Sequence, residues 1–268
     1  MAIQQDRPDP GSRIDTSVPH SARIWNYWLG GKDNYPVDRE AGDVYAASFP
    51  EVRQLARASR EFLARTVRHL ARHEGVRQFL DVGTGLPTAD NTHQVAQRHA
   101  PDARVVYVDH DPLVLLHSEA LLSSTSEGVT TYVEADLHDP DVLLAAAWET
   151  LDPARPVALI LSDVLGHVPD DDDARAVVRA LCDGLPPGSF MMLSHAVISP
   201  GAQLAQQGYD ETGAVPYRLR TPDQVRRFFD GLELVEPGVV PMPEWRPDQA
   251  APASFDGVGW GGVGVRTR

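Results

Sequence analysis

Helical and strand-like patterns of apolar residues alternate along most of the chain. Between residues 51 and 74, apolar side chains recur every three or four positions with arginines between them, which predicts an amphipathic helix ending at Gly75. Short runs that are apolar on both faces follow, a pattern typical of buried parallel strands. These runs cover residues 78–83, 104–109, 130–136, 157–163 and 189–195.

Helix-start signals separate several of these runs. In each signal, a residue suited to N-capping precedes a proline, which favours the first helical position. The three signals are Asp111-Pro112, Asp139-Pro140 and Thr221-Pro222. Strands that alternate with helices in this way predict an α/β fold with helices on both faces of a largely parallel sheet.

Acidic residues end four of the predicted strands at regular intervals. Asp81, Asp109, Asp136 and Asp163 are separated by 28, 27 and 27 residues. A strand with its crossover helix needs roughly 30 residues. The four acids are therefore expected at the carboxyl edge of the sheet, where such sheets bind ligands.

The composition is that of an ordinary soluble protein, with 42% hydrophobic and 23% charged residues in 268. No apolar run is long enough to cross a membrane, and residues 1–20 read as a disordered lead-in rather than a signal peptide. The one cysteine, Cys182, favours a reducing cytoplasm. A net charge of −14 without a basic cluster argues against nucleic acid and suits a neutral or cationic small molecule.

The first predicted strand runs into the glycine turn DVGTGLP. Gly83 and Gly85 allow a tight turn that approaches a ligand closely. A dinucleotide fingerprint needs a third glycine at position 88, where the chain has Thr88. Asp81 would repel a pyrophosphate and attract an ammonium, so the turn disfavours an NAD-type oxidoreductase.

The next two acids suit the rest of a nucleoside. An acid at the end of the second strand can accept hydrogen bonds from ribose hydroxyls, and Asp109 occupies that place while Asp111 caps the next helix. Asp136 can meet the exocyclic amine of an adenine whose ring Leu137 covers. The alternative for Asp109 and Asp136 is that each only caps a helix or a turn.

These features together resemble the Rossmann-like S-adenosylmethionine-dependent methyltransferases. The resemblance narrows to one bacterial family with largely uncharacterised substrates, and it extends over nearly the whole chain from about residue 20. It is carried by RIWNYWLGGKDNYPVDREAGD, LDVGTGLPTADNTHQVAQRHAPDARVVYVDHDPLVL and GLELVEPGVVPMPEWRPD. It implies S-adenosylmethionine as cofactor and a mostly parallel, seven-stranded sheet with an antiparallel last strand.

The resemblance also implies a division of the chain and a set of cofactor contacts. Residues 21–75 would form a helical lid, and residues 76–268 the cofactor-binding domain with an insertion near 201–221 that walls the acceptor site. The last strand is expected around 262–266, after a strand within 232–240. The implied contacts are Asp81, Gly83, Thr84, Gly85, Asp109, His110, Asp136 and Leu137.

The lid segment holds the only lysine of the chain, Lys32. As a lid residue, Lys32 or Asn34 would contact the methionine carboxylate of the cofactor, since a compact ammonium meets a single oxygen without the fork of an arginine. The alternative is a coding accident. Trp25, Tyr27 and Trp28 would either shield the sulfonium or pack in the core.

Candidate bases for the acceptor follow the fourth and fifth strands, at Asp163, His167 and His195. Histidine transfers protons near neutral pH, although a lone histidine can equally be structural. The acidic run 170–173 reads as a helix start, and no metal site is expected. The leading function is methyl transfer to an unidentified small molecule. The alternatives are S-adenosylmethionine or S-adenosylhomocysteine binding without efficient catalysis and, behind it, the oxidoreductase.

Overall fold

The computed structural model describes residues 15–88, 90–111, 113–114, 116–117, 123–248 and 258–267. The strands of its sheet are β1 (Gln78–Val82), β2 (Arg104–Asp109), β3 (Val129–Glu134), β4 (Ala158–Ser162), β5 (Phe190–Ala196), β6 (Glu233–Leu234), β7 (Val240–Pro241) and β8 (Gly259–Val265). Residues 1–14 of the predicted lead-in, and Pro112 with most of the helix predicted after it, lie outside the described residues.

The helices surround this sheet. They are α1 (Ser21–Trp28), α2 (Pro36–Ser48), α3 (Val52–Arg72), α4 (Thr92–His99), α6 (Pro140–Ala147), α7 (Asp171–Asp183), α8 (Pro200–Asp210) and α9 (Pro222–Arg227), with short 3₁₀ helices η2 (Val164–His167) and η3 (Met242–Glu244). As the sequence predicts, α6 and α9 begin at the prolines that follow Asp139 and Thr221, and each capping side chain accepts a backbone N–H.

The strand order is β3-β2-β1-β4-β5-β8-β6, and β7 also pairs with β8. The strands from β3 to β5 run parallel, whereas β8 lies antiparallel to β5 and to β6. The predicted fold class, with its antiparallel last strand, is confirmed. The described residues contain one strand more than the seven expected, because the two-residue β7 adds to the far side of β8.

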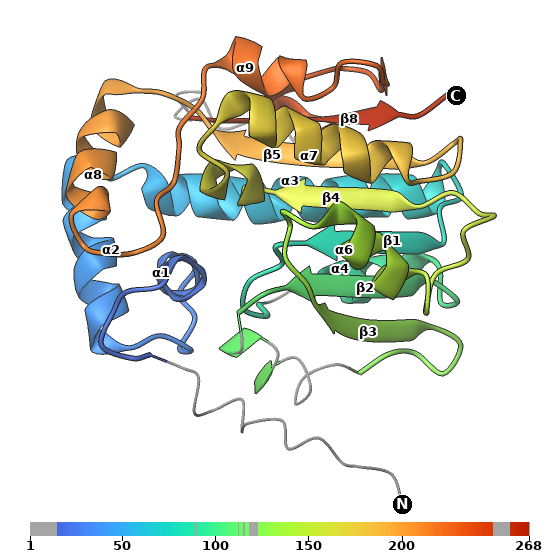
Figure 1. Cartoon of the computed structure of the whole chain (residues 1–268), viewed down its shortest axis with the longest axis horizontal. Helices are drawn as coiled ribbons and strands as arrows, with labels where there is room; N and C mark the ends of the chain where they lie inside the picture. Colours follow the sequence, from blue (N-terminus) through green and yellow to red (C-terminus); the bar gives the residue numbers. More distant parts are fainter. Residues whose placement is uncertain are drawn as a thin grey trace, which may run out of the picture.

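Alternate residues of each central strand enter different halves of the core. Phe79 packs with α3 and α4 on one face, and Leu80 packs with α6 and α7 on the other. In Figure 1, α6 and α7 lie in front of the sheet, and α3 runs behind it. Burial on both faces explains why the central strands are continuously apolar in sequence.

The order of strands reverses beside β1, because the chain adds β2 and β3 on one side and then β4 and β5 on the other. This reversal leaves a crevice at the carboxyl ends of β1 and β4. Helices α1, α2 and α8 gather at that edge, at the left of Figure 1, and α2 packs on α8. Of the predicted lid segment 21–75, α1 and α2 lie at the edge, whereas α3 belongs to the sheet core. Within the described ranges, no helix combines the length and the apolar character that a membrane crossing needs.

Candidate functional site

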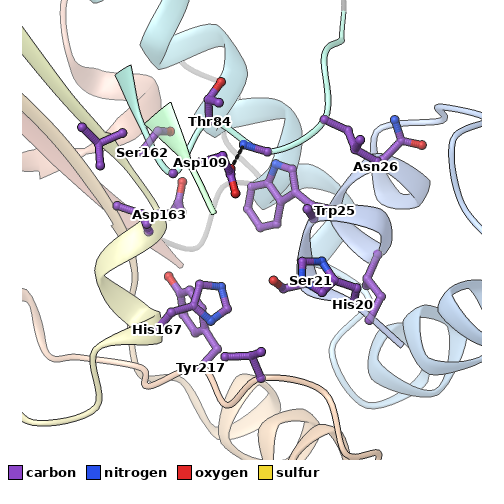
Figure 2. A pocket seen from close by; sticks show the side chains of 18 of the residues that line it. His20, Ser21, Trp25, Asn26, Thr84, Asp109, Ser162, Asp163, His167 and Tyr217 are labelled. Carbon is purple, nitrogen blue, oxygen red and sulfur yellow. Dashed lines mark hydrogen bonds between the residues drawn. The ribbon is translucent and has the colours of Figure 1, made fainter. Parts of the chain in front are cut away.

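A cavity of about 210 Å³ lies at the carboxyl edge, between the strand ends and α1 (Figure 2). Its walls come from the ends of β1 to β5, from α1, α2, α3, α8 and η2, and from the loop that follows α8. Most of the site residues predicted from the sequence line it. They are Asp81, Gly83, Thr84, Gly85, Asp109, His110, Asp136, Leu137, Asp163 and His167.

The glycine turn after β1 is pressed between β2 and η2. Both Gly83 and Gly85 have left-handed backbone conformations, with φ of +70° and +63°. The Gly83 amide donates to the carbonyl of Val108 at 2.8 Å. A Cβ at position 83 would lie 2.2 Å from Cγ2 of Val164. Only glycine therefore fits where the turn meets the floor of the cavity.

Asp109 holds the same turn from the end of β2. Its Oδ2 accepts the Gly85 N–H at 2.8 Å, drawn in Figure 2, and its Oδ1 accepts the Asp111 N–H at 3.0 Å. Burial raises the pKa of the Asp109 carboxyl. Asp111 in turn accepts the Leu113 N–H at 2.9 Å, as its predicted capping role requires. Each Asp109 oxygen retains a lone pair for a ligand.

Asp81 is the most deeply placed of the edge acids. Burial raises its pKa to about 6, although Thr92 Oγ1 donates to its Oδ2 at 2.6 Å and the charge of Arg60 acts in the opposite direction. Arg60 extends from α3 and also lines the cavity. The sequence pattern placed it among the arginines that alternate with the apolar positions of that helix, so its role in the cavity was missed.

Replacing Asp81 by Asn is expected to stabilise the protein at pH 8. The folded-state pKa of about 6 exceeds the ordinary value of 3.8, so the stability tied to the protonated carboxyl is full below pH 3.8 and is lost as the pH rises through 6. Asn mimics the protonated form and keeps the acceptor for Thr92. The variant should gain about 3 kcal/mol in unfolding free energy at pH 8 and almost nothing below pH 4. Urea unfolding at both pH values measures this difference, and a gain independent of pH would contradict it.

A second buried acid, Asp163, follows β4 with a left-handed backbone (φ +56°). Its Oδ2 accepts from the hydroxyls of Ser59 and Ser194. Its Oδ1 is buried and has no hydrogen-bond partner in the described part of the chain. Burial raises the pKa of Asp163, against the hydroxyls. A strained, buried acid at the cavity wall is a feature associated with function rather than with packing.

His167, at the end of η2, has a defined tautomer. Its Nδ1 lies 3.0 Å from the carbonyl oxygen of Pro216, which can only accept, so Nδ1 carries the proton. Burial lowers the pKa of His167, which favours the neutral ring. The remaining nitrogen, Nε2, therefore carries a lone pair and can accept a proton or a hydrogen bond.

The loop that follows α8 holds η2 along its whole length. Besides the contact from His167 to Pro216, the Arg218 N–H donates to the Gly166 carbonyl at 2.7 Å. Arg220 donates to the carbonyls on either side, at 2.8 Å to Leu165 and 2.7 Å to Val168. Tyr217 packs so closely on Gly166 that a Cβ there would lie 2.1 Å from the ring. We call residues 216–220 the η2 clasp.

The residues that follow β3 are more exposed than the acids of the other strands. Leu137 is buried against the core, but the Asp136 side chain is 62% exposed. The His138 N–H donates to Asp136 at 2.8 Å and lowers its pKa. His110 lines the cavity with an exposed ring. This end of the cavity is open to solvent.

Three predicted site residues do not line the cavity. Lys32 is exposed. The Asn34 amide donates to Asn26 Oδ1 and to the Gly31 carbonyl, both at 3.0 Å, so Asn34 holds its own turn together. His195 is fully buried behind the cavity wall, where burial lowers its pKa to about 3. Local packing accounts for Asn34 and His195, and solvent surrounds Lys32.

The lid segment meets the cavity through residues other than Lys32 and Asn34. His20, Ser21 and Trp25 face the strand ends in Figure 2, and Asn26 lines the cavity while its Oδ1 accepts from Asn34 and from the Asp33 N–H. Trp28 also lines the cavity. Sequence reasoning missed His20, Ser21 and Asn26. The glycines at positions 30 and 31 could have indicated a close contact with Asn26. A Cβ at Gly31 would lie 2.4 Å from the Asn26 side chain. Tyr27, by contrast, donates its hydroxyl to Asp43 outside the cavity.

The sheet order, the glycine turn after β1 and the buried acid at the end of β2 define a Rossmann-like nucleoside-binding protein, and the antiparallel β8 is typical of methyltransferases within that class. The sequence matches the model of a family described as S-adenosyl methyltransferase over residues 7–267. The chain belongs to this family and is an S-adenosylmethionine-dependent methyltransferase.

Solved structures agree with this membership. A DUF574 family protein from Streptomyces avermitilis is 45% identical, with a TM-score of 0.90 over 95% of this chain and 100% of that one. A candidate methyltransferase from Thermobifida fusca is 39% identical, with a TM-score of 0.87 over 97% and 99%. At 15% identity, the magnesium protoporphyrin IX methyltransferase of Synechocystis, solved with bound S-adenosylhomocysteine, shares the fold at a TM-score of 0.52 over 91% and 93%. No curated protein matches the sequence.

Proposed function

We propose that the protein transfers the methyl group of S-adenosylmethionine to a small-molecule acceptor. The main support is that one cavity reaches from the acids after β1 and β2 to the segment 201–221. Four residues of that segment line it, namely Gln206, Tyr209, Val215 and Tyr217. Direct transfer needs the donor and the acceptor aligned in contact, and a continuous cavity meets that need.

The polar groups of the cavity suit the cofactor. Asp109 offers lone pairs to the ribose hydroxyls, and Leu137 with Asp136 suits the adenine. Asp81 suits the methionine ammonium, which would compensate the burial of its carboxylate. When bound, S-adenosylmethionine supplies a methyl carbon activated by positively charged sulfur.

Arg60 suits the methionine carboxylate better than Lys32 does, because Arg60 lines the cavity near Asp81 and Lys32 does not. We therefore expect Lys32→Met to leave the affinity for S-adenosylhomocysteine within about twofold of wild type. Arg60→Gln should lower it about tenfold, since a charge-assisted hydrogen bond is lost. Calorimetry of both variants measures the contrast. A weakened Lys32→Met variant would restore Lys32 as a ligand.

At the acceptor end, His167 and Asp163 are the groups that can handle a proton. The neutral His167 ring offers Nε2 as the acceptor for a proton released from the nucleophile. The contact with Pro216 holds the other ring nitrogen and so fixes the direction of Nε2. His195 is too deeply buried to take part directly.

Two measurements test this function. Titration calorimetry should show binding of S-adenosylhomocysteine and none of NADH, because Thr88 and Asp81 stand where a dinucleotide needs glycine and no charge. A screen of small-molecule pools with labelled methyl donor should then find an acceptor. Binding of S-adenosylhomocysteine without transfer to any pool would favour the binding protein over the enzyme. Failure to bind it would overturn the proposal.

A further inference from the structure

Asp163 presents one satisfied and one unsatisfied oxygen at the acceptor end of the cavity. Oδ2 of Asp163 accepts hydrogen bonds from the hydroxyls of Ser59 and Ser194. The Ser162 hydroxyl lies 3.2 Å from each of those two hydroxyls. The other oxygen, Oδ1, is buried without a partner in the described residues. Asp163 is itself 92% buried and lines the cavity, so a ligand is the group available to satisfy Oδ1.

The surroundings of Asp163 leave its charge unneutralised. The groups in the described chain that favour its ionised form are three serine hydroxyls, and no cation is among them. A carboxylate that is solvated by hydroxyls on one side and bare on the other is a site for a cation. The cavity as a whole has the same sign, because Asp81, Asp109, Asp136 and Asp163 line it against one arginine, Arg60.

Aromatic rings also line the cavity. They come from α1, α2, α8 and the η2 clasp, namely Trp25, Trp28, Tyr45, Tyr209 and Tyr217. Such rings cover an apolar body and also attract a cation through their faces. The combination of aromatic walls and an unneutralised acid disfavours a carboxylate or phosphate as the group that reacts.

The hydrogen-bonding pattern separates an amine from an alcohol. Asp163 and His167 both line the cavity, and within the described residues each keeps one acceptor without a hydrogen-bond partner, Oδ1 of Asp163 and Nε2 of His167 (Figure 2). An alcohol has one hydrogen and can satisfy only one of them. An ammonium has three donors and can satisfy both.

We propose that the acceptor is an amine on an apolar or aromatic body, bound through its nitrogen to Oδ1 of Asp163. The proposal rests on the proposed function and adds the substrate class. The bound ammonium gives one proton to Nε2 of His167, and the freed lone pair forms the N–CH₃ bond as the S–CH₃ bond breaks. The sulfur keeps that electron pair and becomes the neutral thioether of S-adenosylhomocysteine.

The test uses the full chain saturated with S-adenosylhomocysteine and three probes of matched shape, 2-phenylethylamine, 2-phenylethanol and 3-phenylpropanoate. Calorimetry should show the amine binding about tenfold or more tighter than the alcohol, and no binding of the carboxylate. Asp163→Asn should remove that preference while the affinity for the alcohol stays the same. The control is Asp141→Asn on the exposed face of α6, which makes the same charge change outside the cavity and should bind like wild type.

The outcomes separate this inference from the proposed function. If the wild-type protein binds S-adenosylhomocysteine but prefers the alcohol, binds the probes alike or binds none, the amine proposal is overturned and the cofactor assignment stands. If Asp163→Asn still binds S-adenosylhomocysteine and keeps the amine preference, the proposal is again overturned. If the wild-type protein does not bind S-adenosylhomocysteine, the proposed function itself fails. The comparison of amine with alcohol needs no variant, so it holds even if Asp163→Asn misfolds.

Discussion

Asp109→Ala is expected to weaken S-adenosylhomocysteine binding by about 2–4 kcal/mol, or about 30-fold to 1,000-fold. The substitution removes the proposed acceptor of the ribose hydroxyls. It also frees the Gly85 N–H, which Asp109 holds at 2.8 Å, so the glycine turn loses its support from β2. The first loss acts on the bound state alone, and the second also weakens the turn in the free protein. Titration calorimetry at neutral pH measures the change.

Two comparisons make this prediction specific. Asp109→Asn keeps an oxygen for Gly85 and should recover part of the affinity. Asp141→Ala removes an exposed acid of α6 and should leave binding unchanged. Urea unfolding should show that Asp109→Ala remains folded. A folded Asp109→Ala variant with wild-type affinity would show that Asp109 only anchors the turn.

Gly83→Ala is expected to lower the unfolding free energy by about 2–5 kcal/mol. A left-handed backbone costs an alanine about 1–2 kcal/mol, and overpacking in a filled site adds about 1–3 kcal/mol. The overpacking arises because the new Cβ would lie 2.2 Å from Cγ2 of Val164. Equilibrium urea unfolding of the variant measures the loss.

Gly75 provides a matched control for the backbone cost. It has the same φ of +70°, but a Cβ there would meet no atom within 4 Å. Gly75→Ala should therefore cost only the conformational part, and the difference between the two variants gives the clash. Val164→Ala removes the nearest atom but leaves its own Cβ at 2.7 Å, so it should rescue Gly83→Ala only in part. If Gly75→Ala and Gly83→Ala lower the unfolding free energy equally, η2 must move to make room for the extra methyl group.

The edge acids were predictable because their positions depend on local pattern. Parallel strands bring their carboxyl ends to one edge, so acids that end strands, such as Asp81 and Asp109, meet there whatever the details of packing. The antiparallel β8 was also expected, but from the family resemblance and not from periodicity. The short β7 carries too few residues to leave a pattern.

Side-chain direction explains the residues that the sequence placed differently. His195 and Ser194 are neighbours in β5, and adjacent side chains of a strand point to opposite faces. Ser194 reaches Asp163 at the cavity, so His195 points away and packs beside Arg220. Because side chains alternate along a strand, the sequence could have predicted that His195 points away from the cavity once Asp163 had been assigned to it.

The positions of the Lys32 and Arg60 side chains relative to the cavity could not be predicted from local sequence patterns. Lys32 lies two residues after Gly30, whose φ is +82°, and such a turn sets a side-chain direction that residue spacing does not encode. Arg60 resembles the other arginines of α3 in sequence. Its place beside Asp81 follows only from the way α3 docks on the sheet, which is a long-range contact.

In the proposed function, the η2 clasp couples acceptor choice to proton transfer. The loop that supplies Tyr217 to the acceptor wall is the same loop whose Pro216 carbonyl orients His167. An insertion or exchange that reshapes this wall for another substrate must shift the proton acceptor as well. Under the proposed function, a change of acceptor among relatives built this way would require residues 164–168 and 216–220 to change together. An engineered graft of either segment alone would separate the proposed base from its substrate.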